Sequence, residues 1–344
     1  MNLDICMAAD NNYATHLGIC IISIAKNNQL NDITIHVLNN NISDRNLKKI
    51  ESLEREFSNL KIKFYNILEY FDKNDISNLI KNTLKDNDFF NLLGISAFSR
   101  LFLQDLLPEN IEKILYLDSD TIVLDDLSEL FHINLDNNYV GGVIDIMANI
   151  TKHYYLFENK STPFINSGVL LINLKKWRKI DFAKLAINLI NDYPDKNFLH
   201  DQNIINILCE DNVLLLNPKF NVMSEFFYVD YKKNLKLNSY FGSIDGFYPE
   251  NEIKHSLSHP VVVHFLSQVW DRPWMIHNGI FKHVPKNPFN KCYDYYKSIS
   301  PWKNDVLATN DKKILDKLYY EVIRFIMMYF PAPVLAFLHF IKKG

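Results

Sequence analysis

Short apolar runs alternate with helix-length segments along the first part of the chain. The apolar runs favour β-branched residues and end in polar turn residues, a pattern typical of strands. Strands are expected at residues 3–9, 33–38 and 61–67, and helices at residues 13–25 and 45–56. Strand, helix, strand, helix, strand in this order predicts a parallel sheet of the Rossmann-like type.

The same pattern continues beyond residue 95. A helix is expected over residues 96–107, before Pro108. Later strands are expected at residues 113–117, 139–144, 168–174, 212–216 and 261–265, and later helices at residues 177–193 and 200–209. Without a repeat or a Gly/Ser-rich linker, the pattern predicts one mixed α/β catalytic unit. We place this unit at residues 1–275 and a helical C-terminal extension at residues 276–344.

The last part of this extension is apolar. Residues 325–341 contain no Asp, Glu, Lys or Arg and are followed by Lys342 and Lys343. Pro331 and Pro333 make the stretch a poor spanning helix. We expect two short helices in the interface of a membrane, with aromatic residues and lysines at headgroup level. The alternative is that the stretch covers an apolar groove on the domain or on an oligomer partner.

Composition narrows the class of protein. A net charge of −3 over 344 residues offers no electrostatic case for binding nucleic acid. The four cysteines show no CxxC spacing, which fits a reducing compartment. The first ten residues, MNLDICMAAD, lack the basic region of a secretory signal. We therefore expect a cytoplasmic protein.

Two carboxylates one residue apart follow the expected strand at residues 113–117. Asp118 and Asp120 would lie at the carboxyl end of that strand, where ligands bind in open α/β sheets. Side chains at i and i+2 point the same way on extended backbone, so both can face one cation. Such hard oxygen ligands suit Mg²⁺ or Mn²⁺. The alternative is that Asp-Ser-Asp simply makes a turn.

Two chemistries use such a pair. In a glycosyltransferase, D-x-D holds a metal on a sugar-nucleotide diphosphate. In a haloacid-dehalogenase-like phosphatase, D-x-D-x-T supplies a nucleophile and a general acid, and Thr121 completes that string. The phosphatase also needs a lysine and a second acid pair on later strand ends, and Asp125 and Asp126 come too soon. Its motif usually opens the domain, whereas here a long α/β segment precedes it.

Longer motifs decide between these chemistries by resemblance. The chain resembles the retaining glycosyltransferases of family 8 over about residues 1–275. The resemblance lies in DICMAADNNYATHLGICIISI, AFSRLFLQDLLPENIEKILYLDSDTIVLDDLSELF, FINSGVLLINLKKW, HDQNIINIL and VVVHFLSQVWDRPW. It implies a GT-A fold and metal-dependent transfer of galactose or glucose from a UDP-sugar, with retention. A UDP-sugar-binding protein without catalysis remains an alternative.

The resemblance also assigns residues to the metal and to the nucleotide. It implies that Mn²⁺ or Mg²⁺ is held by Asp118, Asp120 and His264. A histidine at a strand end is more often structural, but neutral imidazole is an acceptable donor to Mn²⁺. The residues implied in nucleotide binding are Ala8, Asp10, Asn12, Tyr13 and Ser119. Tyr13 is expected to stack on uracil; the alternative is a tyrosine packed in the core beside a capped helix start.

The diphosphate loop departs from the usual family pattern. Relatives typically have a glycine and then Lys-Pro-Trp after the histidine, whereas this chain has Ser267 near the glycine's place and Arg272 in the lysine's. A guanidinium can hold a diphosphate bidentately. The missing glycine puts a close backbone approach to the β-phosphate in doubt.

Five further residues are implied on the sugar side. Arg100, Asn166, Asp201 and Gln202 would surround the donor sugar, and Asp145 would lie by the acceptor. Without the resemblance, Arg100 would be interpreted as an ordinary surface arginine. The Gln202 amide is a poor nucleophile, so we expect the acceptor to attack on the face that the leaving group departs from. Asp201 is the carboxylate to examine for a covalent intermediate. The expected acceptor is a glycan or lipid-linked glycan at the inner face of the membrane.

Overall fold

The computed structural model describes most of the chain. The described ranges are residues 1–76, 78, 95–145, 162–193, 200–228, 230–240, 247–266, 272–274 and 287–307, with residues 322, 325, 326, 329 and 330 of the C-terminal part. Ser267 and most of the apolar stretch 325–341 lie outside them. The predictions for both therefore stay untested by the structure.

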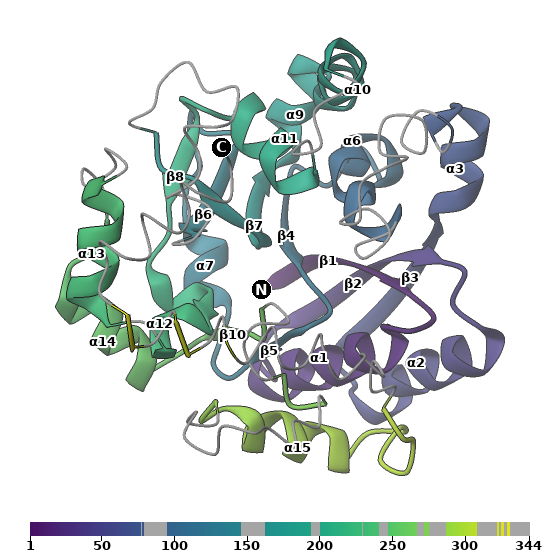
Figure 1. Ribbon diagram of the computed structural model, residues 1–344. Coiled ribbons are helices and arrows are strands. Elements are labelled where there is room, and N and C mark those ends of the chain that lie inside the picture. Colours follow the sequence, from purple (N-terminus) through teal and green to yellow (C-terminus); the bar gives the residue numbers. More distant parts are fainter. Residues whose placement is uncertain are drawn as a thin grey trace.

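A mixed sheet forms the centre of the molecule (Figure 1). Its strands are β1 (Asn2–Asp10), β2 (Asp32–Asn40), β3 (Leu60–Asn66), β4 (Lys113–Leu117), β6 (Val140–Ile144), β7 (Ile165–Asn173) and β8 (Val213–Leu215). They lie in the order β3-β2-β1-β4-β7-β6-β8. Strands β1 to β4 pair in parallel, and β7 runs antiparallel to both β4 and β6. The parallel pairing predicted for a Rossmann-like sheet is confirmed for β1 to β4, and antiparallel β7 makes the sheet as a whole mixed.

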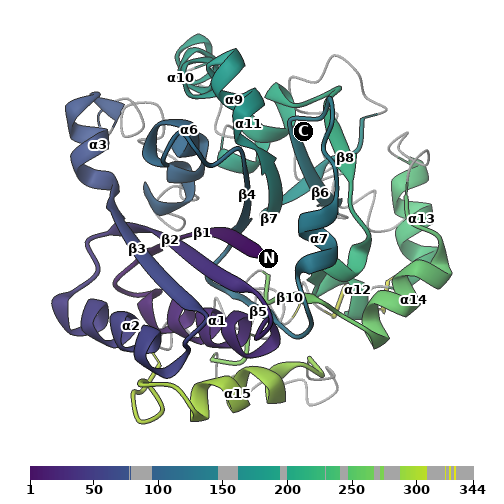
Figure 2. The same cartoon turned by 180° about the vertical axis from the view of Figure 1, so that it is seen from behind.

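Helices cover both faces of this sheet (Figures 1 and 2). On one face lie α1 (Ala14–Asn27) and α2 (Asp44–Glu56), and on the other lie α3 (Ile67–Lys73), α6 (Leu103–Leu106), α9 (Leu174–Ile180), α10 (Phe182–Asp192) and α11 (Asp201–Leu208). Successive side chains of β1 alternate between the two cores. Ile5 and Met7 belong to the core with α1, whereas Cys6 and Ala8 belong to the core with Phe71. Burial on both faces explains why the central strands β1, β4, β6 and β7 are almost continuously apolar.

A second, smaller sheet joins three distant segments. It contains β5 (Thr121–Val123), β9 (Val222–Met223) and β10 (Val262–His264), in the order β5-β10-β9. His264 pairs with Thr121 on one side and with Met223 on the other. This pairing brings the end of β10 beside the two acids that precede β5.

Two segments that are each predicted as one helix are divided in the structure, so both predictions are wrong in this respect. The helix predicted over residues 177–193 is divided into α9 and α10 at Asp181, whose φ is 54° and therefore left-handed. The segment predicted as a helix over residues 96–107 contains the 3₁₀ helix η1 (Ser99–Phe102), followed by α6. Further elements were not predicted: α7 (Ser128–His132), η3 (Pro218–Phe220), α12 (Glu225–Tyr228), α13 (Tyr231–Tyr240) and α14 (Glu250–Ser258). Helix α15 (Asn290–Ser298) lies in the extension that is predicted to be helical.

The first part of the predicted extension packs against α1. Helix α15 lies beside α1 in both views (Figures 1 and 2). Trp302, which follows α15 in the sequence, is fully buried. A Cβ atom on Gly18 would lie 2.2 Å from the Trp302 ring, so this contact needs a glycine. The Tyr293 hydroxyl also lies 2.6 Å from Nδ1 of His16. Within the described ranges, no helix is long and apolar enough to span a bilayer.

Candidate active site

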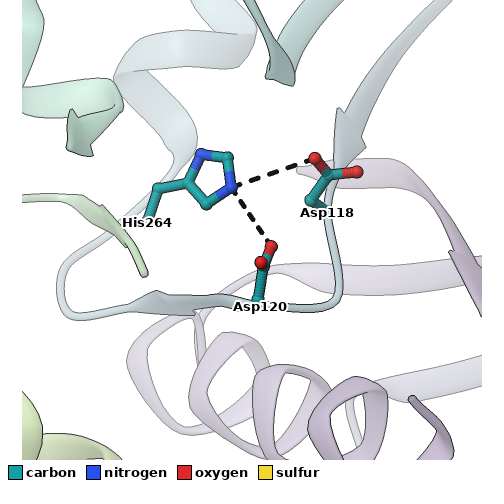
Figure 3. A group of neighbouring side chains, drawn as sticks. All are labelled: Asp118, Asp120 and His264. Atoms are coloured by element: carbon teal, nitrogen blue, oxygen red, sulfur yellow. Dashed lines mark hydrogen bonds and ion pairs between the residues drawn. The ribbon is translucent and has the colours of Figure 1, made fainter. Parts of the chain in front are cut away.

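Three potential metal ligands converge at the carboxyl end of the central strand β4 (Figure 3). Asp118 follows β4, Asp120 precedes β5, and His264 ends β10. The Nε2 atom of His264 lies 3.1 Å from Oδ1 of Asp120 and 3.9 Å from Oδ2 of Asp118. One ligand atom from each residue lies within 4.8 Å of the others, close enough to share one cation.

Backbone pairing holds these side chains together. The N–H of Asp118 donates to the carbonyl of Gly168 at 2.7 Å, and the N–H of Phe265 donates to the carbonyl of Asp120 at 3.0 Å. A Cβ atom on Gly168 would lie 2.1 Å from Cε1 of His264 and 2.7 Å from Oδ2 of Asp118. A glycine is therefore needed where β7 passes beneath the ligands.

The pKa values of Asp118 and Asp120 are shifted in opposite directions. Burial raises the pKa of Asp118, and neighbouring Arg100 offsets only part of this effect. Burial also raises the pKa of Asp120, but His264 and Arg272 outweigh it, so the net shift is downward. Two carboxylates and one imidazole form a donor set that fits Mn²⁺ or Mg²⁺.

Arg100 is buried behind the acids, with 4% of its surface exposed. Its Nη2 donates to Oδ1 of Asp118 at 2.8 Å, and its Nε lies 3.1 Å from Oδ2 of Asp201. Its Nη1 donates to the carbonyl of Ser167 at 2.7 Å. Interpretation as an ordinary surface arginine is wrong, because this buried guanidinium links the partly buried carboxylate of Asp118 to the buried carboxylate of Asp201.

The predicted sugar-side residues form one hydrogen-bonded group. Strand β6 ends and antiparallel β7 begins on the side of the sheet where β4 ends. This arrangement brings Asp145 and Asn166 together with Gln202 at the start of α11. Oδ2 of Asp145 accepts from Nδ2 of Asn166 at 3.2 Å and from Nε2 of Gln202 at 3.1 Å. Oε1 of Gln202 accepts from the N–H of Ser167 at 3.0 Å. These contacts hold the polar groups in fixed orientations.

The predicted nucleotide loop lies at the carboxyl end of β1. Oδ1 of Asp10 accepts from the N–H groups of both Asn12 and Tyr13 at 3.0 Å and so shapes the turn. Tyr13 is 36% exposed, which contradicts the alternative that it packs in the core. The Ser119 hydroxyl donates to the carbonyl of Ala8 at 2.8 Å and ties this loop to the acid pair.

Arg272 lies between the nucleotide loop and the acid pair. Its Nη2 donates to Oδ2 of Asp120 at 3.0 Å, and its Nη1 donates to the hydroxyl of Tyr13 at 3.0 Å. The structure thus brings the expected base-stacking residue, diphosphate ligand and metal ligand together. Among the residues that the structure describes, the basic side chains within ion-pair distance of the acid pair are Arg100, Arg272 and His264. The lysine that a phosphatase needs is not among them.

Sequence reasoning missed three residues of this region. Gly168 and Ser167 follow Asn166 directly, so their place in the same motif was an available signal. Asn221 contacts both His264 and Asn166, but the second asparagine in NPKFNVM carries no sequence signal of its own.

Comparison with known proteins identifies the family. The sequence profile described as Glycosyl transferase family 8 matches residues 4–275. The chain belongs to glycosyltransferase family 8. This family 8 glycosyltransferase is 28% identical over 307 residues to General stress protein A of Bacillus subtilis, covering 87% of this chain and 94% of that protein. It is 24% identical over 343 residues to a lipopolysaccharide 1,2-glucosyltransferase of Escherichia coli, covering 97% and 89%.

A solved structure matches the fold of this glycosyltransferase. The galactosyltransferase LgtC, in complex with donor and acceptor sugar analogues, superposes with a TM-score of 0.65 at 23% identity. The match covers 88% of this chain and 99% of LgtC. The predicted GT-A fold is confirmed, and the phosphatase alternative is not supported.

Proposed function

We propose that this glycosyltransferase transfers a hexose, galactose or glucose, from a UDP-sugar to a glycan or glycolipid acceptor with retention. The observation that carries the proposal is the convergence of Asp118, Asp120 and His264 beside the loop that contains Tyr13. These three residues would hold Mn²⁺ or Mg²⁺. When bound, the cation would supply positive charge to neutralise the departing diphosphate.

The nucleotide would lie over the carboxyl ends of β1 and β4. Tyr13 offers an exposed ring for the uracil, and its hydroxyl already accepts a hydrogen bond from Arg272. Arg272 would exchange its contact with Asp120 for the diphosphate oxygens, which its fork of donors fits. Ala8, Asp10, Asn12 and Ser119 would complete the nucleotide loop, and Ser267 is proposed to act near the phosphates.

The surroundings of Asp201 support attack on the face of the departing group. Its side chain is 4% exposed, lies 3.1 Å from Nε of Arg100 and accepts from the Ser167 hydroxyl at 3.2 Å. A carboxylate held in this way is a poor nucleophile, and the Gln202 amide is a poorer one. We therefore propose that the leaving phosphate takes the proton of the acceptor hydroxyl. Asp145, Asn166 and Gln202 would orient the sugars through their hydrogen-bonding groups.

A donor screen tests the proposed function. Purified protein is incubated with individual UDP-sugars and Mn²⁺, and UDP release is measured with and without EDTA. Slow UDP release from UDP-galactose or UDP-glucose, abolished by EDTA, is the expected result. Donor binding without any release would indicate a non-catalytic UDP-sugar-binding protein. Release of phosphate from simple phosphoesters without affinity for UDP would indicate a phosphatase.

We also propose that the apolar C-terminal segment attaches the enzyme peripherally to the inner face of a membrane. Support comes from the composition of residues 325–341 and from their flanking lysines. A variant ending at residue 310 retains α15 and Trp302, whose packing belongs to the folded body. The full chain is expected to sediment with anionic vesicles, whereas the truncated chain stays in the supernatant. Equal sedimentation of both chains would contradict the proposal.

A further inference from the structure

Asn221 is a fully buried residue between the candidate metal ligands and the candidate donor-sugar residues. It follows η3 and precedes β9, and none of its surface is exposed. Its Oδ1 lies 3.2 Å from Nδ1 of His264, and its Nδ2 donates to Oδ1 of Asn166 at 2.9 Å. One side chain thus touches a candidate metal ligand and a candidate donor-sugar residue.

The orientation of this amide follows from a backbone group. The N–H of Gly168 can only donate, and it lies 3.0 Å from Oδ1 of Asn166, so that Asn166 atom must be an acceptor. The Asn221 atom facing the same oxygen is therefore its NH₂ group. The remaining amide atom of Asn221 is the oxygen, and it faces Nδ1 of His264.

The amide oxygen in turn determines the protonation of the histidine. An amide oxygen can only accept, so Nδ1 of His264 must carry a proton. In a neutral imidazole with a protonated Nδ1, the lone pair lies on Nε2. The Nε2 atom is the one that faces Asp120 at 3.1 Å and Asp118 at 3.9 Å. A carboxylate oxygen can only accept, so a bound cation would replace any proton on Nε2 that faces Asp120, while Nδ1 keeps its own proton. With the cation bound, the lone pair on Nε2 would point to the place where the carboxylates converge.

We propose that Asn221 is a positioning residue that holds His264 in the Nδ1–H tautomer and couples this ligand to Asn166. The inference rests on the proposed metal site. The Nδ1–H contact keeps the ring at the angle that directs Nε2 toward the cation. The contact with Asn166 ties the same amide to the group formed by Asp145 and Gln202. Loss of such a supporting partner typically weakens metal binding by about 10- to 100-fold.

Mn²⁺ binding without any substrate provides the main test. The Asn221→Leu variant keeps a similar side-chain volume but removes both hydrogen bonds. Titration of the full chain with Mn²⁺, followed by the electron paramagnetic resonance signal of free Mn²⁺, is expected to give about a 10- to 100-fold higher Kd for the variant than for wild type. An unchanged Kd would overturn the inference.

A matched control separates positioning from general destabilisation. Asn28 is also fully buried, donates to the Ile24 carbonyl at 2.9 Å and accepts from the N–H of Leu127 at 2.8 Å. It lies at the end of α1 remote from Tyr13, so Asn28→Leu also loses a buried amide without affecting the ligands. We expect this variant to bind Mn²⁺ as wild type does. Equal weakening of Mn²⁺ binding in both variants would mean a merely structural role for Asn221.

A second variant gives a result even if Asn221→Leu does not fold. In Asn221→Asp the carboxylate still accepts from Nδ1 of His264 but cannot donate to Oδ1 of Asn166. Its Mn²⁺ affinity is therefore expected to match wild type, while its kcat for transfer falls about tenfold because the Asn166 acceptor loses its partner. Weakened Mn²⁺ binding in this variant would overturn the proposed tautomer. If wild type itself bound no Mn²⁺, the proposed metal site would fail, and this inference would fail with it.

Discussion

Replacement of Asp120 by Asn is expected to lower the kcat for sugar transfer by about a thousandfold or more. The substitution keeps the size of the side chain but removes the negative charge that faces His264 at 3.1 Å and Arg272 at 3.0 Å. A neutral amide is a weak ligand for a hard cation, so the variant is expected to bind the cation poorly. The positive charge that would neutralise the departing diphosphate is then lost as well. Initial rates of UDP release at saturating UDP-hexose, measured over a series of Mn²⁺ concentrations, provide the test.

The control for this substitution is an exposed acid nearby in the sequence. Asp125 is exposed and makes a local contact with the N–H of Asp126. Asp125→Asn makes the same chemical change outside the site and should leave both kcat and the Mn²⁺ requirement unchanged. Substantial activity of Asp120→Asn in EDTA would show that transfer does not depend on a metal at this position.

Replacement of Arg100 by Met is expected to be the most destabilising change in the site. The guanidinium lies between Asp118 and Asp201, and the Asp201 side chain is only 4% exposed. Removing one partner of a buried ion pair costs about 3–5 kcal/mol, because an uncompensated charge stays buried. We expect the lower end of that range, since the Asp118 side chain is 26% exposed and water offsets part of the loss. Urea unfolding followed by circular dichroism measures the change.

Two companion variants make this prediction specific. Arg100→Lys keeps the charge but cannot reach both carboxylates and the Ser167 carbonyl at once, so it should lose less stability than Arg100→Met. Arg45→Met removes an exposed partner of Asp305, whose side chain lies 3.5 Å away, and should change the free energy of unfolding by less than about 0.5 kcal/mol. A loss for Arg100→Met as small as that for Arg45→Met would refute the buried role of this arginine.

Family resemblance supplied site residues that local patterns do not reveal. His264 and Arg272 stand out only because they occur in VVVHFLSQVWDRPW, since a lone histidine at a strand end is more often structural. The contact of His264 with Asp120 spans 144 positions, and that of Arg272 with Asp120 spans 152. The metal role of these residues remains a proposal, but the proximity on which it depends is present in the structure.

Some features of the structure have no signal in the local sequence pattern. Asn221 lies in no recognisable motif, yet its two hydrogen bonds connect the metal side to the sugar side. The local pattern around Arg100 favours a surface arginine, and only the family resemblance placed it beside the acid pair, because the sequence of a helix does not reveal what covers it. The break at Asp181 also escaped prediction, since its left-handed φ occurs inside an amphipathic pattern suited to one continuous helix.

The sequence by itself determined the strands of the sheet and the position of the acid pair at a strand end. These are short-range properties, because apolar runs rich in β-branched residues that end in polar turn residues are typical of buried strands. The tertiary structure alone decided which distant residues meet those acids. The pairing of β5, β10 and β9 brings Asp120, His264 and the segment of Asn221 together. Such pairing depends on the register between strands far apart in the chain, which no local pattern of residues specifies.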